Sequence, residues 1–366
     1  MSQFLNEIME QPASTQATLD YYISPAGQRE LGNLRNMIRS GKPNKLIFTG
    51  MGSSFFVSYA ASLLFNKLGI ASFAMNTSEL LHYQLPILDS KCMVVCVSQS
   101  GESYEVVKLL EKIPEDVMCI GVSNEEKSSL TRSAKEVLIT RAGKEERTST
   151  KTYLATTLVM FILGWFLADL WNAEKVKKIN KMIKSMKDIL GRRSELTRNM
   201  SDFLGDVEFV QFIGRGPSYS TVLQSELMFK EGARVAAAGT LGGEFRHGPM
   251  EMVKPGFKSI LFAPEGKTYS QSVKMAEDIA KYNGKVVMVT NTDCHGISDS
   301  NIMPILVEQP DEYLFSIQST VPVQLLRMNS LIICSSSISC RLIKPQYSGL
   351  ASLTQSRLRR HQPFLD

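Results

Sequence analysis

The chain has 366 residues, of which 43% are hydrophobic, 21% charged and 8% aromatic. This is the composition of an ordinary soluble globular protein, and it excludes an intrinsically disordered chain, a collagen-like repeat and a disulfide-stapled mini-domain. The net charge of +5 is a small excess that does not require a nucleic acid partner and would suit a phosphorylated small molecule. At this length, two domains are the natural division.

The first residues, 1–12, contain two acids but no basic or apolar stretch, so they do not predict a signal peptide. Residues 153–170 are almost apolar enough to span a bilayer. They contain Thr156, Thr157 and Asp169, however, and we predict a helix buried in a domain or a subunit interface rather than a membrane span. Reduced, core-packed thiols are expected for the six cysteines: Cys92, Cys96, Cys119, Cys294, Cys334 and Cys340. We therefore expect a cytoplasmic protein.

Apolar stretches alternate with helical patterns along the whole chain. In the first half, strands are predicted over Lys45–Thr49, Met93–Ser98, Met118–Val122 and Val137–Thr140, with helices beginning near Ser54, Ser103 and Ser129. Residues 174–205 are rich in lysine, arginine and methionine at helical spacing and predict a helical connector. In the second half, strands are predicted over Phe209–Ile213, Lys258–Ala263, Lys285–Thr290 and Ile305–Val307. This alternation predicts an α/β fold with parallel sheets covered by helices on both faces.

Two stretches, residues 46–69 and 210–232, look alike: each has a short apolar strand, a G-x-G turn with a serine, and an amphipathic helix. Three residue pairs share one offset of 164 positions: Gly50 with Gly214, Gly52 with Gly216, and Ser54 with Ser218. A repeat of this length indicates a duplicated domain. We therefore divide the chain into a helical segment (1–30), a first domain (31–173), the connector (174–205), a second domain (206–335) and an atypical serine-rich, basic tail (336–366).

The run Ser98-Gln99-Ser100-Gly101-Glu102-Ser103 lies between a predicted strand and a predicted helix. Open α/β sheets bind ligands at the carboxyl ends of their strands, and a helix N-terminus offers free N–H groups and a partial positive charge to an anion. The plain alternative is helix capping, but capping needs one hydroxyl, and this run has four polar side chains besides the glutamate. The run favours phosphate binding.

Two further turns are weaker signals. The turn from Gly50 through Gly52 to Ser54 lacks the third glycine of a dinucleotide fingerprint. The next predicted strand, residues 72–76, does not end in the aspartate or glutamate that such a site uses. A nicotinamide cofactor is therefore not expected; the glycines can simply turn the backbone, while Ser54 can add a hydroxyl to the anion site. The run Thr148–Lys151 opens a long apolar helix, and an N-cap explains it as well as a ligand contact does.

The second half carries Lys230-Glu231 at a helix end and the run GGEFRHGP over residues 242–249. His247 precedes Gly-Pro and should sit in a fixed turn, where it can serve acid–base chemistry near neutral pH or act as a structural hydrogen-bonding group. The Cys294-His295 pair lacks a second pair of ligands at metal spacing, as does the pair of cysteines 92 and 96, so no metal site is expected.

Together, SQSGES, the STK run and KE followed by GGEFRHGP resemble the isomerase half of glucosamine-6-phosphate synthase, in the family of tandem sugar-isomerase (SIS) domain proteins. The resemblance runs from about Phe4 to about Leu326. It implies two tandem SIS domains, each a flavodoxin-like three-layer sandwich with a parallel sheet flanked by helices. By position it implies phosphate-binding residues Ser54, Ser98, Gln99, Ser100 and Ser103, and sugar contacts from Ser149 and Gly52.

The resemblance also implies a proton-abstracting Glu231 and a ring-opening His247 supplied by the other subunit, hence a homodimer or a higher oligomer, with no cofactor and no metal. Three features depart from the synthase: no glutaminase segment with its nucleophilic cysteine is expected, Gln224 and Met228 replace a family glutamate and lysine, and the sequence after Arg327 does not match the family's tail with its Schiff-base lysine.

These departures point to the family's standalone bacterial deglycases, which act on fructoselysine or glucoselysine 6-phosphate. We therefore expect cleavage of a ketosamine 6-phosphate to hexose 6-phosphate and amine by aldose–ketose-type proton transfer. An aminosugar-phosphate isomerase or deaminase remains an alternative. A non-catalytic sugar-phosphate sensor is disfavoured, because no helix-turn-helix precedes the first domain and because both Glu231 and His247 are present. Neither a nucleic acid nor a membrane partner is expected.

Overall fold

The computed structural model describes residues 2–146, 148–294, 296–309 and 311–327, and the expected tail, 336–366, lies outside them. Within these residues the strands form two five-stranded parallel sheets. The first has the order β2-β1-β3-β4-β5, made of β1 (Lys45–Gly50), β2 (Ser72–Asn76), β3 (Cys92–Val97), β4 (Met118–Ser123) and β5 (Glu136–Ile139). The second has the order β10-β9-β8-β6-β7, made of β6 (Phe209–Gly214), β7 (Ala236–Leu241), β8 (Lys258–Ala263), β9 (Lys285–Thr290) and β10 (Ile302–Leu306).

The predicted parallel sheets are confirmed, and the central strands explain why. All six residues of β3 are buried, as expected of a parallel strand covered on both faces. The two less accurate assignments are edge strands. The prediction at Ile305–Val307 was wrong in its bounds, because Pro304 lies inside β10 and interrupts the pattern, which only an edge strand tolerates. The strand β7 was missed because AAAGTL has little strand propensity.

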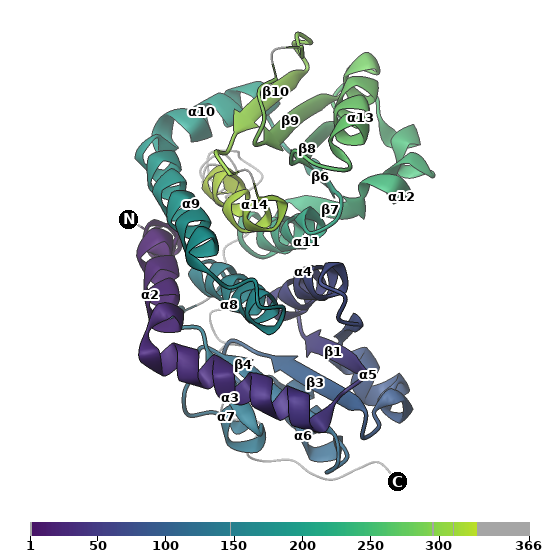
Figure 1. The fold of residues 1–366 in the computed structure, drawn as a ribbon. Coiled ribbons are helices and arrows are strands. Elements are labelled where there is room, and N and C mark those ends of the chain that lie inside the picture. The colour runs from purple at the N-terminus through teal and green to yellow at the C-terminus, as the bar shows by residue number, and fades with distance from the viewer. Residues whose placement is uncertain (1, 147, 295, 310, 328–366) are drawn as a thin grey trace.

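Helices cover both faces of each sheet (Figure 1). In the first half they are α1 (Gln3–Met9), α2 (Gln11–Ile23), α3 (Pro25–Gly41), α4 (Ser53–Lys67), α5 (Thr77–Tyr83), η1 (Leu85–Ile87), α6 (Tyr104–Lys112), α7 (Ser129–Ser133) and α8 (Lys151–Leu167). The expected helical connector is α9 (Ala173–Gly191) and α10 (Arg193–Leu204). The second half adds α11 (Ser218–Met228), the π-helical turn η2 (Phe229–Ala233), α12 (Gly242–Arg246), η3 (Pro249–Met252), α13 (Tyr269–Lys281) and α14 (Glu312–Gln318).

The inner helices α4, α8, α11 and α14 contact one another between the two sheets (Figure 1). One hydrophobic core therefore runs from Phe48 of β1 to Phe212 of β6. Every residue of α8 from Lys151 to Phe166 is buried in this layer, which confirms the prediction of a buried helix over this apolar stretch. Among the described residues, no helix has both the length and the apolar character needed to cross a bilayer.

The two sheets share one topology, because in each the second strand of the domain pairs with the first, which pairs with the third. The glycines of the sequence repeat also play the same part in both. A Cβ at Gly50 would lie 2.7 Å from Ser54 Cβ, and a Cβ at Gly214 would lie 2.8 Å from Val222 Cγ2. In each domain the end of the first strand thus approaches the following helix so closely that only glycine fits. The predicted duplication is confirmed.

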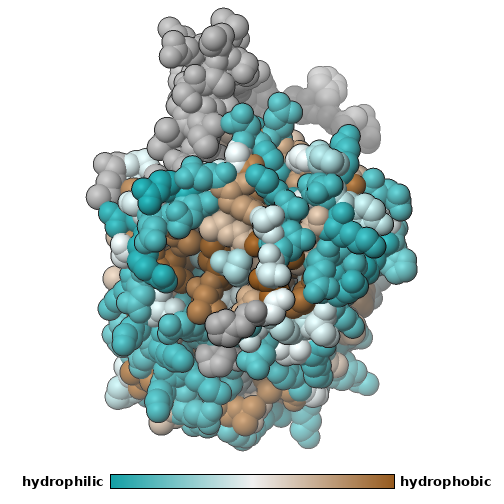
Figure 2. Space-filling model, turned by 90° about the horizontal axis from the view of Figure 1, so that it is seen from above, coloured by the Kyte–Doolittle hydropathy of each residue, from teal (hydrophilic) through white to brown (hydrophobic). Residues whose placement is uncertain are grey.

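The surface of the second domain is mixed in character. Seen from above the view of Figure 1, hydrophobic residues are exposed in the middle of the face and hydrophilic residues surround them (Figure 2). Large apolar side chains of this domain that are at least half exposed include Met252, Tyr282 and Leu306. Single exposed apolar residues are normal on a soluble surface, whereas a contiguous area indicates a contact site.

Candidate active site

The first sheet has a topological switch point between β1 and β3, where the chain's connections run in opposite directions. These strands are neighbours, with Thr49 opposite Cys96 in the register. The turn Gly50–Ser54 follows β1 and the loop Ser98–Ser103 follows β3, so both lie at the same edge of the sheet. In open α/β folds, ligands bind in the crevice at this point. The structure therefore brings together two of the predicted site segments.

Hydrogen bonds within the chain hold the loop Ser98–Ser103 in one conformation. Ser98 is buried, and its Oγ accepts a hydrogen bond from the Gly101 N–H at 3.1 Å. Ser100 Oγ accepts one from the Glu102 N–H at 3.2 Å. The Gln99 carbonyl accepts two, from Ser123 Oγ and from the Asn124 N–H. The loop is thus preorganised before any ligand arrives.

The hydroxyl of Ser103 does not cap the helix that it precedes. Ser103 is the N-cap residue of α6, but its side chain accepts no capping hydrogen bond from the described residues. Instead, its Oγ lies 3.3 Å from Ser98 Oγ. Two hydroxyls therefore face each other beside the first N–H groups of a nine-residue helix. Capping does not explain this serine, and phosphate binding by the loop stays a prediction.

Asn124, which the sequence analysis missed, ties this loop to the segment that leads to α8. It follows β4, and its N–H donates to the Gln99 carbonyl at 3.0 Å. Its Nδ2 donates to the Gly143 carbonyl at 2.9 Å, and its Oδ1 accepts from the Thr140 hydroxyl at 2.8 Å. The position of Asn124, a polar residue directly after a buried strand, is the pattern in the sequence that could have revealed it. Through Asn124, residues 140–143 are held beside the loop Ser98–Ser103.

Glu145, also missed, caps α8 in place of the serine and threonines of the STK run. Its carboxylate accepts hydrogen bonds from the N–H groups of Thr150 at 2.8 Å and Thr152 at 3.2 Å. Thr150, the N-cap residue, makes no side-chain capping bond in the described part of the chain. Burial raises the pKa of Glu145, and these hydrogen bonds act in the opposite direction. Ser149 is left with its Oγ 2.9 Å from Thr152 Oγ1, and its contact with sugar stays a prediction.

Glu231 lies on η2, the π-helical turn that directly continues α11; such turns occur frequently at functional sites. Glu231 is an exposed residue, but its carboxyl group is partly buried, and this burial raises its pKa. The Arg327 charge and a hydrogen bond with the Thr148 side chain lower it to a smaller extent. A carboxylate with a raised pKa is a better base near neutral pH than an ordinary one.

Helix α11 places Glu231 against the first domain. Gln224 Nε2 donates to the Ser149 carbonyl at 2.9 Å. Leu227, four residues before the glutamate, would lie 3.8 Å from a Cβ on Gly52. Glu231, the STK run and the G-x-G turn thus lie near one another, at the edge of the first sheet where the loop Ser98–Ser103 also lies.

Arg327 is the third residue that the sequence analysis did not assign to the site. Its guanidinium packs so closely on Gly232 that a Cβ there would lie 1.3 Å from Nη2, and it stacks 3.6 Å from the ring centre of Phe4. Burial lowers the pKa of Arg327 to about 10, and Glu231 acts in the opposite direction. The arginine is distant from Glu231 in sequence, so no local pattern could have revealed the pair.

His247 sits in the turn after α12, as predicted, and its N–H donates to the Glu244 carbonyl at 3.0 Å. Its residue is exposed. Figure 1 shows α12 at the outer edge of the second sheet, on the side of β7, whereas α11 lies against the first domain. Glu231 precedes β7, and His247 follows α12 beyond the other end of that strand, so within one chain the two residues lie toward opposite ends of β7.

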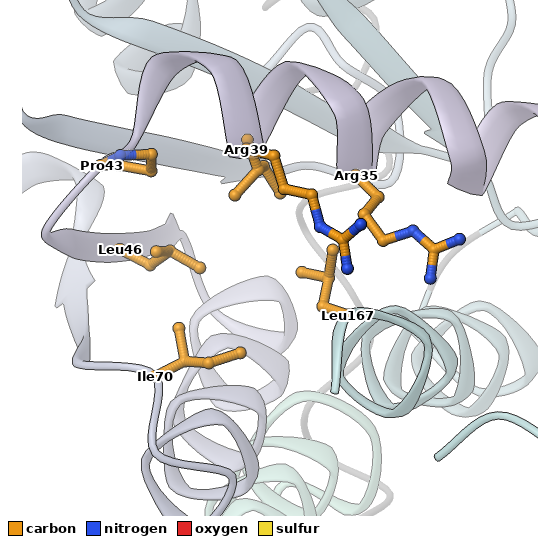
Figure 3. A pocket seen from close by; sticks show the side chains of 7 residues that line it. Arg35, Arg39, Pro43, Leu46, Ile70 and Leu167 are labelled. Carbon is orange, nitrogen blue, oxygen red and sulfur yellow. The ribbon is translucent and has the colours of Figure 1, made fainter. Parts of the chain in front are cut away.

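A cavity of about 140 Å³ lies at the opposite end of β1, beside Leu46 (Figure 3). Arg35 and Arg39 of α3 line it together with apolar side chains that include Leu46 and Leu167. Both guanidinium groups are already paired with Asp169, at 2.7 and 3.7 Å. The cavity is therefore a poor candidate for the phosphate site.

The charged groups of the described residues do not form a metal centre, since no three histidine, cysteine, aspartate or glutamate side chains gather within ligating reach there. The buried ammonium of Lys151 is paired with Glu10. Cys92, Cys96 and Cys119 are buried free thiols, and burial raises the pKa of Cys92 to about 11. The hydroxyls, amides and the Glu231 carboxylate are thus the groups that this edge of the first sheet offers to a ligand.

Comparison with known proteins places this geometry in context. The SIS domain family matches residues 41–164 and 204–334. A curated relative, the glutamine–fructose-6-phosphate aminotransferase (isomerizing) of Pyrococcus horikoshii, is 29% identical over 328 residues, covering 88% of this chain and 53% of that protein. The chain spans about half the length of the curated relatives it matches.

Two solved structures share the fold. The C-terminal domain of glucosamine-fructose-6-phosphate aminotransferase from Francisella tularensis has a TM-score of 0.79 at 21% identity, covering 91% of this chain and 96% of that chain. The tagatose-6-phosphate ketose/aldose isomerase of Escherichia coli has a TM-score of 0.74 at 18% identity, covering 91% and 93%. At these identities the likeness establishes the fold alone.

Proposed function

Because the chain belongs to the SIS domain family, we propose that it is a sugar-phosphate-binding enzyme whose first switch point holds the phosphate of a hexose 6-phosphate derivative. The observation that carries the proposal is the pair of hydroxyls of Ser98 and Ser103 beside the N-terminus of α6. A phosphate at this place would receive hydrogen bonds from both hydroxyls and from backbone N–H groups. Five residues would make this subsite: Ser54, Ser98, Gln99, Ser100 and Ser103.

The sugar would extend from the phosphate toward Glu231. Gly52 and Ser149 border that path, because Gly52 faces α11 and Ser149 is bonded to Gln224. An ionised glutamate at position 224, as in the synthase that the sequence resembles, would have no N–H to donate to that carbonyl. Gln224 therefore makes a contact with the first domain that a glutamate at this position could not make.

We propose that the substrate is a ketosamine 6-phosphate. With the ring open, Glu231 takes a proton from C1 and returns it to C2, while the proton of the C1 amine nitrogen moves to the C2 oxygen. The C1 amine thereby becomes an imine and the C2 carbonyl becomes a hydroxyl. Water then adds to C1 and the C1–N bond breaks, releasing hexose 6-phosphate and the free amine. The raised pKa of Glu231 supports its role as base, since a fixed, partly desolvated carboxylate takes a weakly acidic proton better than a solvated one. These steps draw only on side chains and water.

Ring opening requires a group that carries a proton between the ring oxygen and the anomeric hydroxyl. We assign this step to His247 of a second copy of the chain. The exposure of His247 and its place toward the other end of β7 from Glu231 support a shared site in a homodimer. A histidine suits the step because its ordinary pKa lies near neutral pH.

An aminosugar-phosphate isomerase or deaminase is the alternative, favoured by the names of the similar proteins, an isomerizing aminotransferase and a ketose/aldose isomerase. Both reactions use the same proton transfer between C1 and C2. The two proposals differ in where the sugar carries its amine, on C1 in a ketosamine and on C2 in an aminosugar, and in whether an amine is released.

The test is a panel of 6-phosphorylated ketosamines, glucosamine 6-phosphate and fructose 6-phosphate, offered to the purified full chain. Release of amine from a ketosamine, with no turnover of the other two, supports the deglycase. Turnover of glucosamine 6-phosphate or fructose 6-phosphate alone supports the alternative. The Glu231→Gln variant, tested beside the native chain, controls for contaminating enzymes, because it should lack whichever activity the native chain shows.

A further inference from the structure

The guanidinium of Arg327 is a buried cation with unused hydrogen-bond donors. The residue is only 5% exposed. Its Nε and Nη1 N–H groups have no hydrogen-bond partner among the described residues. Burial lowers the pKa of Arg327 to about 10, so the group is still cationic at neutral pH. Buried charges and buried donors are normally paired, so an arginine in this state needs an explanation.

Two residues from distant parts of the chain contact this guanidinium. The ring centre of Phe4, on α1, lies 3.6 Å from Cζ. A Cβ built on Gly232, on η2, would lie 1.3 Å from Nη2, 1.8 Å from Cζ and 2.0 Å from Nε. Gly232 does not have a positive φ, so its backbone conformation does not require glycine. The glycine instead leaves the space that the guanidinium occupies.

This packing places the cation beside the proposed base. Gly232 directly follows Glu231 on η2, so the guanidinium lies against the backbone of the turn that carries the carboxylate. Burial raises the pKa of Glu231, and the Arg327 charge lowers it. In the same way, the Glu231 charge raises the pKa of Arg327, against the larger effect of burial. Each charge therefore favours the ionised form of the other.

Other polar and charged groups around Glu231 have less influence on it or have other partners. Thr148 contributes a hydrogen bond to the carboxylate but no charge. Arg234, the other arginine of this turn, is exposed to solvent, where screening weakens its effect. The remaining charged groups on the elements packed here are paired or bonded elsewhere: Lys230 with Glu226, Lys151 with Glu10, and Glu145 with the N–H groups of Thr150 and Thr152.

We propose that Arg327 is a positioning residue for Glu231: its guanidinium, packed against Gly232, holds the turn η2 and keeps the carboxylate ionised in partly buried surroundings. The inference rests on the proposed function, in which Glu231 takes the C1 proton, because a carboxylate must be ionised to act as a base. Gly232 and Arg327 then form a matched pair, since any side chain at position 232 would displace the guanidinium.

The first measurement needs no substrate. ¹³C NMR of the full chain with labelled glutamate follows the Glu231 carboxyl carbon against pH, and the signal is assigned by its absence from Glu231→Gln. In Arg327→Gln the titration midpoint should move to higher pH, because the charge that favours the ionised form is gone. Arg327→Lys keeps the charge and should move the midpoint less. Arg234→Gln, which removes an exposed charge from the same turn, is the matched control and should keep the native midpoint.

Gly232→Ala tests the packing. Its Cβ should displace the guanidinium and move the midpoint in the same direction as Arg327→Gln does. Gly232→Ala added to Arg327→Gln should move the midpoint no further, because the charge is already absent.

The second measurement is the pH dependence of kcat/KM for the substrate that the panel identifies. In Arg327→Gln the acidic limb should move to higher pH, which lowers kcat/KM at least about threefold on that limb and leaves the alkaline plateau near the native value. The substrate phosphate and His247 titrate in every variant, so the difference between variants reports on Glu231. A purely structural role would lower kcat/KM by the same factor at every pH.

A native midpoint in a folded Arg327→Gln chain would overturn the proposal, as would an equal shift in Arg234→Gln. Circular dichroism checks folding, and Gly232→Ala decides in the same way if Arg327→Gln does not fold. If the chain turns over no member of the panel, the proposed function fails, while the NMR midpoints still show whether Arg327 acts on Glu231.

Discussion

The two SIS domains have the same strand order and the same glycine at the end of their first strand, but their switch points differ in chemistry. In the first, the hydroxyls of Ser98 and Ser103 face an uncapped helix start, and no carboxylate of the described residues bonds to either. In the second, between β6 and β8, the carboxylate of Glu312 reaches two glycine turns: a Cβ built on Gly216 would lie 3.5 Å from its Oε1, and a Cβ built on Gly266 would lie 3.9 Å from its Oε2. The two halves thus share their scaffold but differ in the charge of the side chains at the switch point. Fold likeness between the halves does not imply two equal sites.

The difference also shows what else a site requires. The first switch point adjoins Glu231 of the second domain, because α11 packs on α4 and bonds to the Ser149 carbonyl. The start of the same helix, at Ser218, belongs to the second switch point. One helix therefore serves both places, with its N-terminus at the second switch point and its π-helical end at the first.

The largest effect should come from Glu231. We expect Glu231→Gln to slow turnover by roughly 10²–10⁴-fold, because the amide cannot accept the C1 proton. The variant should no longer exchange that proton with deuterated solvent, as followed by NMR, while it still binds hexose 6-phosphate. Glu277→Gln on α13 is the matched control and should exchange at the native rate. Native exchange in Glu231→Gln would require another base.

The phosphate loop should give the next effect. Ser98→Ala and Ser100→Ala should each weaken hexose 6-phosphate binding by roughly 1–3 kcal/mol, through the loss of a charge-assisted hydrogen bond. Thr268→Ala, at the N-cap of the second domain's α13, is the matched change and should leave this binding unaltered. Calorimetry checks both. Equal losses in the two domains would remove the distinction between the switch points.

Sharing of sites between two chains predicts complementation. Mixing the inactive Glu231→Gln and His247→Ala chains under conditions of subunit exchange should restore about a quarter of native activity, since half the dimers are hybrids with one intact site of two. Mass spectrometry of the mixture verifies exchange. Hybrids that form and stay inactive would show that His247 does not act across the interface.

A smaller effect concerns Glu145, which caps α8 beside the first site. Burial raises its pKa in the folded chain, so folding favours the protonated form, and this contribution is fully present only below the unfolded pKa of about 4.5. Stability should therefore fall as the pH rises from there through the raised folded pKa. Urea unfolding at several pH values should show a weaker fall in Glu145→Gln than in the native chain, and an identical fall would contradict the assignment.

Local patterns sufficed for much of the fold, because buried central strands such as β3 and the buried helix α8 are written as continuous apolar runs. Local patterns failed at the two edge strands. The small residues of β7 give little apolar signal, and Pro304 interrupts the apolar run of β10. The phosphate loop was readable as polar residues after a buried strand.

The remaining parts of the site were not readable in this way. Glu145 contacts Thr150 and Thr152, which lie only five and seven residues further on, but through a loop whose path no motif indicates. Arg327 and Glu312 contact residues that distant elements bring near them: Gly232 and the two glycine turns. None of these pairs has a motif spacing. Such contacts follow from how the domains pack, which one sequence does not state.

The central claim is that sugar phosphate binds at the first switch point beside Glu231 and not at the second. A crystal structure of the chain with an open-chain hexitol 6-phosphate tests it most directly. We predict density for the phosphate against Ser98 and Ser103, with C1 and C2 of the ligand next to the Glu231 carboxylate, and Glu312 still between Gly216 and Gly266. Phosphate density at the Gly216 and Gly266 turns, or a ligand whose C1 and C2 lie away from Glu231, would contradict the account.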